Sequence, residues 1–284
     1  MTRMQVMLLT TTAMLAFAGN SLLCRMALRH TGIDAASFTC IRIVSGALVL
    51  WLIVRARGEK IGGAGSWTSA LALFAYAAGF SFAYVSLPAA TGALLLFGAV
   101  QATMISYGIW KGERFRAPQL AGLLLAFGGL IGLLLPGLSA PPLVAGMLML
   151  GAGIGWGVYS LRAKGALDPT LVTAGNFMRA VPLAAGLAIA MLPSMAPDTS
   201  GILYAVASGA LTSGLGYAIW YTALRGLKAA SAATVQLSVP VIAAMGGIAF
   251  LGEPVTLRLL LTSTLILGGI ALFILDARRP AGCK

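Results

Sequence analysis

The sequence is a succession of long apolar runs separated by short charged segments. About 20 apolar residues suffice for an α-helix to cross the roughly 30 Å hydrocarbon core of a bilayer. A segment in hydrocarbon must satisfy its backbone hydrogen bonds internally, so these runs are expected to be helices. The sequence therefore predicts an all-α integral membrane protein with ten transmembrane helices, near residues 4–28, 34–54, 67–87, 89–110, 117–136, 142–162, 170–192, 200–224, 230–251 and 255–275.

The composition excludes several other classes of protein. Hydrophobic residues make up 59% of the 284 residues and charged residues only 9%, whereas about a quarter of the residues of a soluble protein are charged. The single histidine, His30, argues against a His-based metal site, and three cysteines do not form a disulfide framework. The 19 basic residues are spread thinly between apolar runs, unlike the clustered basic surface of a nucleic-acid-binding domain. We predict no metal, no cofactor and no nucleic-acid partner.

The basic residues mark alternate loops. The positive-inside rule places the loops rich in Lys and Arg in the cytoplasm, which predicts that both termini are cytoplasmic. Arg42 and Arg179 fall within spans, and Arg25, Arg29 and Arg258 fall outside. The cytoplasmic set is Arg3, Arg55, Arg57, Lys60, Lys111, Arg114, Arg116, Arg162, Lys164, Arg225, Lys228, Arg278, Arg279 and Lys284.

The sequence also matches itself at about half its length. At an offset of 137, Arg25 aligns with Arg162 and Arg42 with Arg179; at an offset of 140, Gly112-Glu113 aligns with Gly252-Glu253. Such a period indicates an internal repeat, with a five-span half in residues 1–138 and another in residues 139–284. Because five is odd, the second half starts from the opposite side of the membrane, as in many secondary transporters with a site between inverted repeats.

These features together resemble the drug/metabolite transporter superfamily, in its EamA-type branch. The residues that carry the resemblance are the ten spans, the duplication and the Gly-Glu step after the fourth and ninth spans. The resemblance implies a basket-like bundle whose central cavity is lined by spans 1, 3, 4, 6, 8 and 9, with spans 5 and 10 peripheral. It also implies a protein of the bacterial inner membrane, and within the branch the chain looks most like exporters of aromatic amino acids.

Polar and aromatic residues inside the spans are the candidate substrate contacts, because lipid-facing positions disfavour polar groups. Most recur at helical spacing on one face, and aromatic faces with a few amides and hydroxyls suit an amphipathic organic ligand. Such stripes can instead pack helices or, as expected for Trp67 and Tyr84, form an interfacial belt. The candidates are Phe17, Asn20, Ser21, Tyr76, Phe80, Phe97, Gln101, Trp156, Tyr159, Ser160, Tyr217, Tyr221 and Gln236.

Two prolines are candidate hinges. Pro240 lies within the ninth predicted span and removes one backbone donor there, and Pro88 lies between the third and fourth spans. Both could support a change between conformations, and both could equally mark static kinks.

The charged residues near the spans have two interpretations. Arg42 and Arg179 lie about a third of the way into their spans, from which arginine can snorkel to the interface; the alternative is a clamp for a carboxylate or phosphate. Glu113 and Glu253 lie at span ends near Arg114 and Arg258, where capping or surface pairing is expected.

We predict a secondary transporter, not an enzyme, that works as a monomer in the lipid bilayer and exports small amphipathic metabolites by alternating access. Amino acids, including aromatic ones, are the expected substrates. No Walker-type glycine loop is present, and every acidic residue falls in a loop or at a span end, so facilitated export is favoured. The alternatives are a multidrug or other metabolite exporter, with proton coupling through an end-of-span acid, an integral-membrane enzyme acting on lipids, and a structural subunit.

Overall fold

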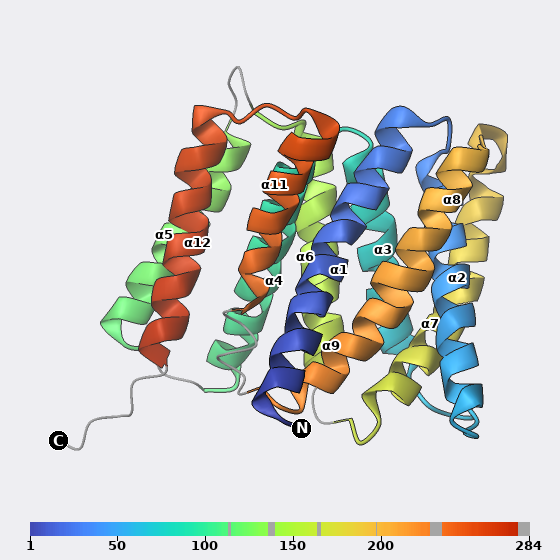
Figure 1. Ribbon diagram of the computed structural model, residues 1–284. Helices are drawn as coiled ribbons and strands as arrows, with labels where there is room; N and C mark the ends of the chain where they lie inside the picture. Colours follow the sequence, from blue (N-terminus) through green and yellow to red (C-terminus); the bar gives the residue numbers. More distant parts are fainter. Residues whose placement is uncertain (113–114, 136–139, 164–165, 197, 228–234, 278–284) are drawn as a thin grey trace.

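The computed structural model describes residues 1–284 except 113–114, 136–139, 164–165, 197, 228–234 and 278–284 (Figure 1). Its described part is helical and contains no strand. The eighth crossing joins α8 (Thr199–Ala207), the π-helix η2 (Ser208–Leu215) and α9 (Gly216–Leu224). The other elements are α1 (Arg3–His30), α2 (Ala35–Ala56), α3 (Trp67–Tyr84), α4 (Ala89–Trp110), α5 (Ala117–Leu134), α6 (Leu143–Ala163), α7 (Pro169–Ala190), the short 3-10 helix η1 (Leu192–Ser194), α11 (Ser238–Leu251) and α12 (Leu257–Ala277). The predicted fold of ten membrane helices is confirmed.

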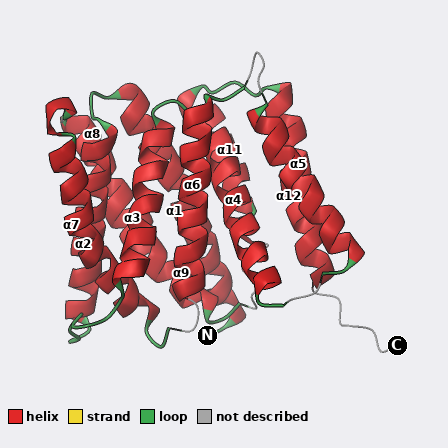
Figure 2. Cartoon of the chain, turned by 180° about the vertical axis from the view of Figure 1, so that it is seen from behind, coloured by secondary structure: helices red, strands yellow, loops and turns green. Residues whose placement is uncertain are grey.

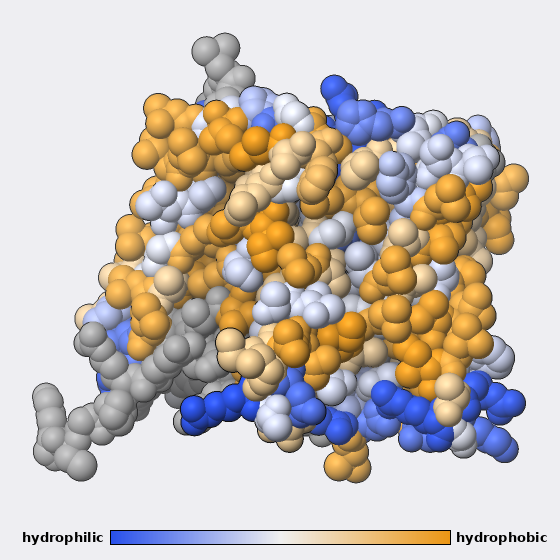
Figure 3. All heavy atoms as spheres, viewed as in Figure 1, coloured by the Kyte–Doolittle hydropathy of each residue, from blue (hydrophilic) through white to orange (hydrophobic). Residues whose placement is uncertain are grey.

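The helices run alternately between two faces. We call the face at which α1 begins and α12 ends the terminal face, and the opposite one the distal face (Figure 1). A hydrophobic belt lies between them (Figure 3). Among the described basic residues of the loops and helix ends, Arg25, Arg29 and Arg258 lie toward the distal face. Those toward the terminal face are Arg3, Arg55, Arg57, Lys60, Lys111, Arg116, Arg162 and Arg225.

The helices differ in how well they suit a lipid environment. By length and composition, 7 described segments are apolar enough to cross a membrane; α11 contributes a shorter apolar stretch and α12 the shorter stretch Leu257–Phe273. Helix α3 is absent from both sets because tyrosines and serines lower its hydropathy. Its polar and aromatic face, including Tyr76 and Ser81, is buried inside the bundle. Helix α3 is therefore built for the interior.

The packing follows the two-fold relation that the sequence repeat predicts. Helix α2 packs on its counterpart α7, and α5 packs on its counterpart α12. Helix α3 packs on α6, and their counterparts α8–α9 and α1 pack in the same way. The paired Gly112 and Gly252 both adopt left-handed backbone conformations, with φ of 89° and 61°. The expected boundary after residue 138, like Glu113, lies outside the described residues.

The pair α5–α12 lies at one edge of the molecule, as the resemblance implied (Figures 1 and 2). The two helices contact each other much more extensively than they contact α4. The remaining eight crossings enclose the centre of the bundle.

The closest approach near the centre is between η2 and α2. A Cβ atom on Gly209 would lie 2.0 Å from the Ser45 hydroxyl oxygen and 2.2 Å from the Arg42 carbonyl oxygen. Only glycine therefore allows the two backbones to meet at this point. This approach places the polar face of η2 against α2.

We expect Gly209→Ala to destabilise the fold, because the added methyl group forces η2 away from α2. Overpacking of this kind costs about 1–3 kcal/mol, measured as a lower thermal unfolding temperature in detergent. Gly186→Ala in α7 is the matched control, since a Cβ there meets nothing within 4 Å. The control should stabilise by about 0.5–1 kcal/mol. Equal unfolding temperatures for the two variants would contradict the close packing.

Candidate functional site

A small cavity at the centre of the bundle is lined mostly by aromatic residues. Water centres can occupy about 10 Å³ of it, about the space that a single water molecule needs. A larger ligand therefore requires side chains to move. The lining residues are Phe17, Asn20 and Ser21 of α1, Tyr76 and Phe80 of α3, Leu96 and Phe97 of α4, Trp156 of α6 and Tyr217 of α9.

Trp156 lies at the middle of these aromatic rings. Its ring centroid is 4.8 Å from that of Tyr217, 5.0 Å from that of Tyr76 and 6.0 Å from that of Phe17. Aromatic rings attract one another at these separations in tilted and edge-to-face arrangements. The cluster thus brings α1, α3, α6 and α9 together through rings that can also stack on a ligand.

Asn20 connects this aromatic cluster to η2. Its side-chain oxygen accepts hydrogen bonds from the hydroxyls of Ser208 (2.7 Å) and Thr212 (3.1 Å). Its amide nitrogen donates to the Tyr76 hydroxyl at 3.2 Å. One buried amide therefore joins α1 to α3 and to the π-helix.

The π-helix explains why these hydroxyls face the centre. A π-helical turn is wider than an α-helical one, and such turns are frequent at functional sites. In η2, Ser208, Thr212 and Ser213 are all buried and all hydrogen-bonded to residues of α1 or α2. The sequence analysis missed these three residues. The signal that could have identified them is the run of glycine, serine and threonine inside an apolar span.

Arg42 completes the polar group. Its side chain is only 2% exposed. Its Nε atom donates to the Ser213 hydroxyl (3.1 Å), and one terminal nitrogen donates to the Tyr76 hydroxyl (2.8 Å). The guanidinium also lies over the rings of Tyr76 and Phe80, 5.1 Å and 4.9 Å from their centroids. The expectation that Arg42 snorkels to the interface is therefore wrong.

Its repeat counterpart behaves differently. Arg179 is half-buried and donates to the carbonyl oxygens of Gly175 (3.0 Å) and Ala64, the latter in the loop at the terminal face. Arg179 thus reaches the interface as a snorkelling arginine does. Within the same repeat pair, one arginine serves the loop and the other faces the centre.

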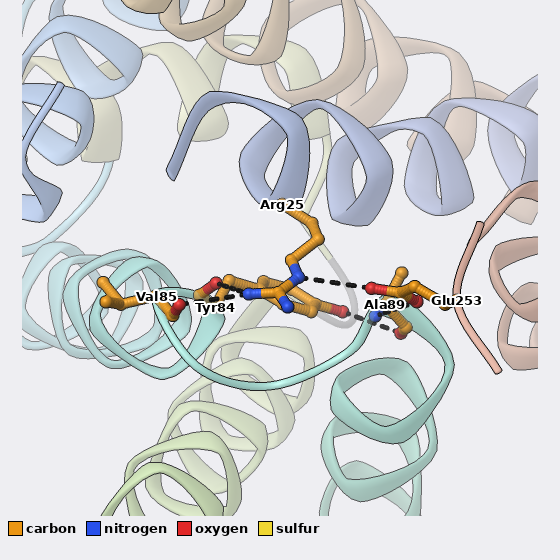
Figure 4. Close-up of polar contacts among 5 residues, drawn as sticks. All are labelled: Arg25, Tyr84, Val85, Ala89 and Glu253. Atoms are coloured by element: carbon orange, nitrogen blue, oxygen red, sulfur yellow. Dashed lines mark hydrogen bonds and ion pairs between the residues drawn. The ribbon is translucent and has the colours of Figure 1, made fainter. Parts of the chain in front are cut away.

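At the distal end, an ion pair ties four helices together. Arg25 Nε lies 3.2 Å from a carboxylate oxygen of Glu253, and a terminal nitrogen of Arg25 donates to the carbonyls of Tyr84 (3.0 Å) and Val85 (3.1 Å). The other oxygen of Glu253 accepts the backbone N–H of Ala89 at 2.8 Å. Figure 4 shows these contacts joining α1, the end of α3, the start of α4 and the end of α11. We call this group the distal latch.

The latch corrects two expectations. Glu253 pairs with Arg25 and not at the surface with Arg258, and the two side chains are only 9% and 11% exposed. Tyr84 is fully buried, and its hydroxyl donates to the carbonyl of Ala89, so it is no belt residue. Trp67, 61% exposed, fits the interfacial position that was expected.

Local backbone geometry positions the Glu253 side chain. Helix α11 ends at Gly252, whose left-handed conformation reverses the chain. The Glu253 N–H then donates to the carbonyl of Gly247 at 3.1 Å. The carboxylate folds back over Gly247, where a Cβ would lie 2.6 Å from its oxygen. Two glycines therefore allow the carboxylate to reach Arg25.

The remaining candidates lie away from the central cavity. Gln101 is buried in a separate small cavity between α4, α5 and α12. Tyr159 lies behind Trp156, at 5.6 Å between ring centroids, and Tyr221 is buried on α9. Ser160 and Gln236 are half-buried and do not line the cavity. The described part of the ninth crossing contributes no lining residue, although the resemblance implied one.

The two hinge candidates border a different space. Pro88 is the N-cap of α4, and Pro240 lies in the first turn of α11, just after the helix is interrupted at Leu237. Both line a groove of about 600 Å³ between α4, α11 and α12, which Glu253 also borders. The groove is mainly apolar and opens beside the distal latch.

Ten crossings in two inverted halves, with aromatic and polar groups gathered between them, define a membrane protein built like a secondary transporter. The EamA-like transporter family matches residues 143–275. An uncharacterized protein of Pseudomonas aeruginosa is 55% identical over 271 residues, which are 95% of this chain and 94% of the relative. An uncharacterized transporter of Archaeoglobus fulgidus is 26% identical over 175 residues, 59% of this chain and 61% of its own.

One solved crystal structure has a TM-score of 0.69 and covers 96% of this chain and 99% of its own, at 23% identity, which shows the fold. The chain belongs to the EamA-like transporter family. It is a multi-pass membrane transporter of the drug/metabolite type.

We expect Asn20→Leu to destabilise the protein by about 1–3 kcal/mol, because it leaves the buried hydroxyls of Ser208 and Thr212 without their acceptor. The measurement is thermal unfolding of the purified protein in detergent. Ser21→Ala is the neighbouring control: the Ser21 hydroxyl has no partner among the described residues, so its loss should change stability by about 0.5 kcal/mol or less. A harmless Asn20→Leu would show that the network does not hold these helices.

Proposed function

We propose that this protein exports small amphipathic metabolites, among them amino acids with aromatic side chains, across the bacterial inner membrane. The observation that carries the proposal is the central cavity, in which aromatic rings from five helices adjoin a connected polar network. Binding sites for small organic molecules combine apolar walls with a few convergent polar groups in this way. The rings would hold the apolar part of the substrate and the network would orient its polar part.

The direction of export follows from the charges. If the terminal face is cytoplasmic, the described basic residues obey the positive-inside rule, with Arg25, Arg29 and Arg258 as the distal exceptions. The distal face would then meet the periplasm. Substrate would enter from the terminal face and leave past the distal latch.

The inverted halves support alternating access around the central cavity. Arg25 is held by a carboxylate, whereas its repeat counterpart Arg162 donates to the hydroxyls of Ser69 (2.9 Å) and Ser66 (3.4 Å). A charge-assisted contact is the stronger of the two. The distal end is thus held more firmly than the corresponding terminal contact, and export requires the latch to open.

The energy source is proposed to be the substrate gradient itself. Within the described residues, the acidic side chains lie in loops or at helix ends, none of them beside the central cavity. Proton coupling is the second candidate, and the position of Glu253 favours it, because protonation would remove the charge that holds Arg25. The two candidates differ in their response to a pH gradient.

Flux into liposomes tests the proposed function. We expect the reconstituted protein to move phenylalanine and tryptophan faster than threonine or a cationic dye. Trp156→Ala should lower aromatic flux about tenfold or more, since it removes several ring contacts of about 0.5–1.5 kcal/mol each. Gln101→Ala is the control and should leave flux unchanged, because Gln101 lies in the separate cavity.

Two outcomes of the flux assay decide against parts of the proposal. Equal flux through Trp156→Ala and the unaltered protein would remove the aromatic cluster from the transport path. Strong acceleration by an imposed pH gradient would contradict facilitated export and favour coupling through Glu253.

Glu253→Gln should open the distal end, because a buried arginine loses its only charged partner among the described residues. Cys24, fully buried one residue before Arg25, is a native reporter of that opening. In a protein with Cys40 and Cys283 replaced by serine, labelling of Cys24 by a water-soluble maleimide should accelerate about tenfold, equivalent to about 1.4 kcal/mol.

The matched control breaks the exposed pair of Arg57 and Asp168, whose charged atoms lie 3.8 Å apart. Arg57→Gln should leave Cys24 labelling unchanged, because surface pairs contribute little. If Glu253→Gln also left the labelling rate unchanged, the ion pair would not hold the distal end closed.

A further inference from the structure

The charge of Arg42 has no counter-ion in the described part of the chain. Its side chain begins seven residues into α2, about 10 Å along the helix from the distal end. The described ion pairs join Arg25 to Glu253 and Arg57 to Asp168, and neither involves Arg42. A buried charge is ordinarily paired, because its removal from water is costly. Neutral hydroxyls and two aromatic rings are what hold this one.

The donors around Arg42 converge on a single point. One terminal nitrogen of Arg42 and the amide nitrogen of Asn20 both donate to the Tyr76 hydroxyl oxygen, at 2.8 Å and 3.2 Å. The other terminal nitrogen of Arg42 is buried and has no hydrogen-bond partner among the described residues. Three donor groups from α1 and α2 are therefore aimed at or beside one oxygen in the wall of the central cavity.

We propose that this point is an anion site, at which Arg42 and Asn20 bind the carboxylate of the transported molecule. One carboxylate oxygen would take the place of the Tyr76 hydroxyl, and the second would accept from the unpartnered nitrogen of Arg42. A guanidinium binds a carboxylate through two parallel hydrogen bonds of this kind. The inference rests on the proposed function and narrows its substrate class to carboxylates with an apolar or aromatic body.

The surrounding rings fit the rest of such a ligand. Tyr76 contacts both Phe80 and Trp156, at 5.4 Å and 5.0 Å between ring centroids. An aromatic side chain attached to the bound carboxylate would reach this cluster once its rings move apart. The positive charge of Arg42 would also disfavour cationic compounds without a carboxylate, since like charges repel in a buried site. The site thus favours amino acids over cationic drugs.

Three related molecules separate the contribution of the carboxylate. Phenylalanine carries it together with an amino group, 3-phenylpropionate carries it alone, and 2-phenylethylamine lacks it. Binding to the purified protein is measured as the ligand-dependent rise in unfolding temperature, since a ligand that binds the folded state stabilises it. Flux of the same three molecules is measured in liposomes.

The unaltered protein should bind both carboxylates at least about tenfold more tightly than the amine. Arg42→Gln should weaken carboxylate binding about 10- to 100-fold, the loss expected for a charge-assisted hydrogen bond, and abolish the preference. Arg42→Lys, which keeps the charge but not the planar pair of donors, should fall between the two. Arg179→Gln is the matched control and should bind all three molecules as the unaltered protein does.

The outcomes separate this inference from the proposed function. Carboxylate-dependent binding without flux would support the anion site and contradict transport. Flux that does not distinguish phenylalanine from 2-phenylethylamine would support transport and overturn the anion site. If Arg42→Gln does not fold, Arg42→Lys decides: full retention of phenylalanine affinity, with no advantage over the amine, overturns the inference, and a partial loss supports it.

Discussion

The structure depends on the polar groups that are buried in the middle of an apolar bundle and must find partners inside the protein. Asn20 provides most of them, because it accepts from two hydroxyls of η2 and donates to α3. Arg42 extends the same set of contacts to α2. The helices around the cavity are therefore positioned by hydrogen bonds that would be far weaker in water. A ligand that enters the cavity must exchange with these contacts.

The two halves share a scaffold but not a chemistry. Helix packing follows the two-fold relation closely, and the glycines that end α4 and α11 adopt the same left-handed conformation. The paired arginines diverge: Arg42 faces the centre and Arg179 serves a loop. Symmetry supplies two similar ways of closing the cavity. The asymmetric residues decide what the cavity can bind and which end is held more firmly.

Much of the fold follows from the sequence, because hydrophobic length, loop charge and an internal repeat are properties of the chain read in order. The aromatic wall was also predictable, since Phe17, Tyr76, Phe80, Trp156 and Tyr217 recur at helical spacing. The direction in which a side chain points around its helix was not. Position along the span suggested that Arg42 snorkels, and Gln101 proved to lie in another cavity. The pairing of Arg25 with Glu253, 228 residues apart, leaves no local pattern.

A structure of the protein with phenylalanine bound tests the central claim most directly. The account predicts that the carboxylate lies within hydrogen-bond distance of Arg42 and Asn20, with the aromatic ring between Trp156 and its neighbours. Phenylalanine bound elsewhere, for example in the groove between α4, α11 and α12, with the central network unchanged, would contradict it.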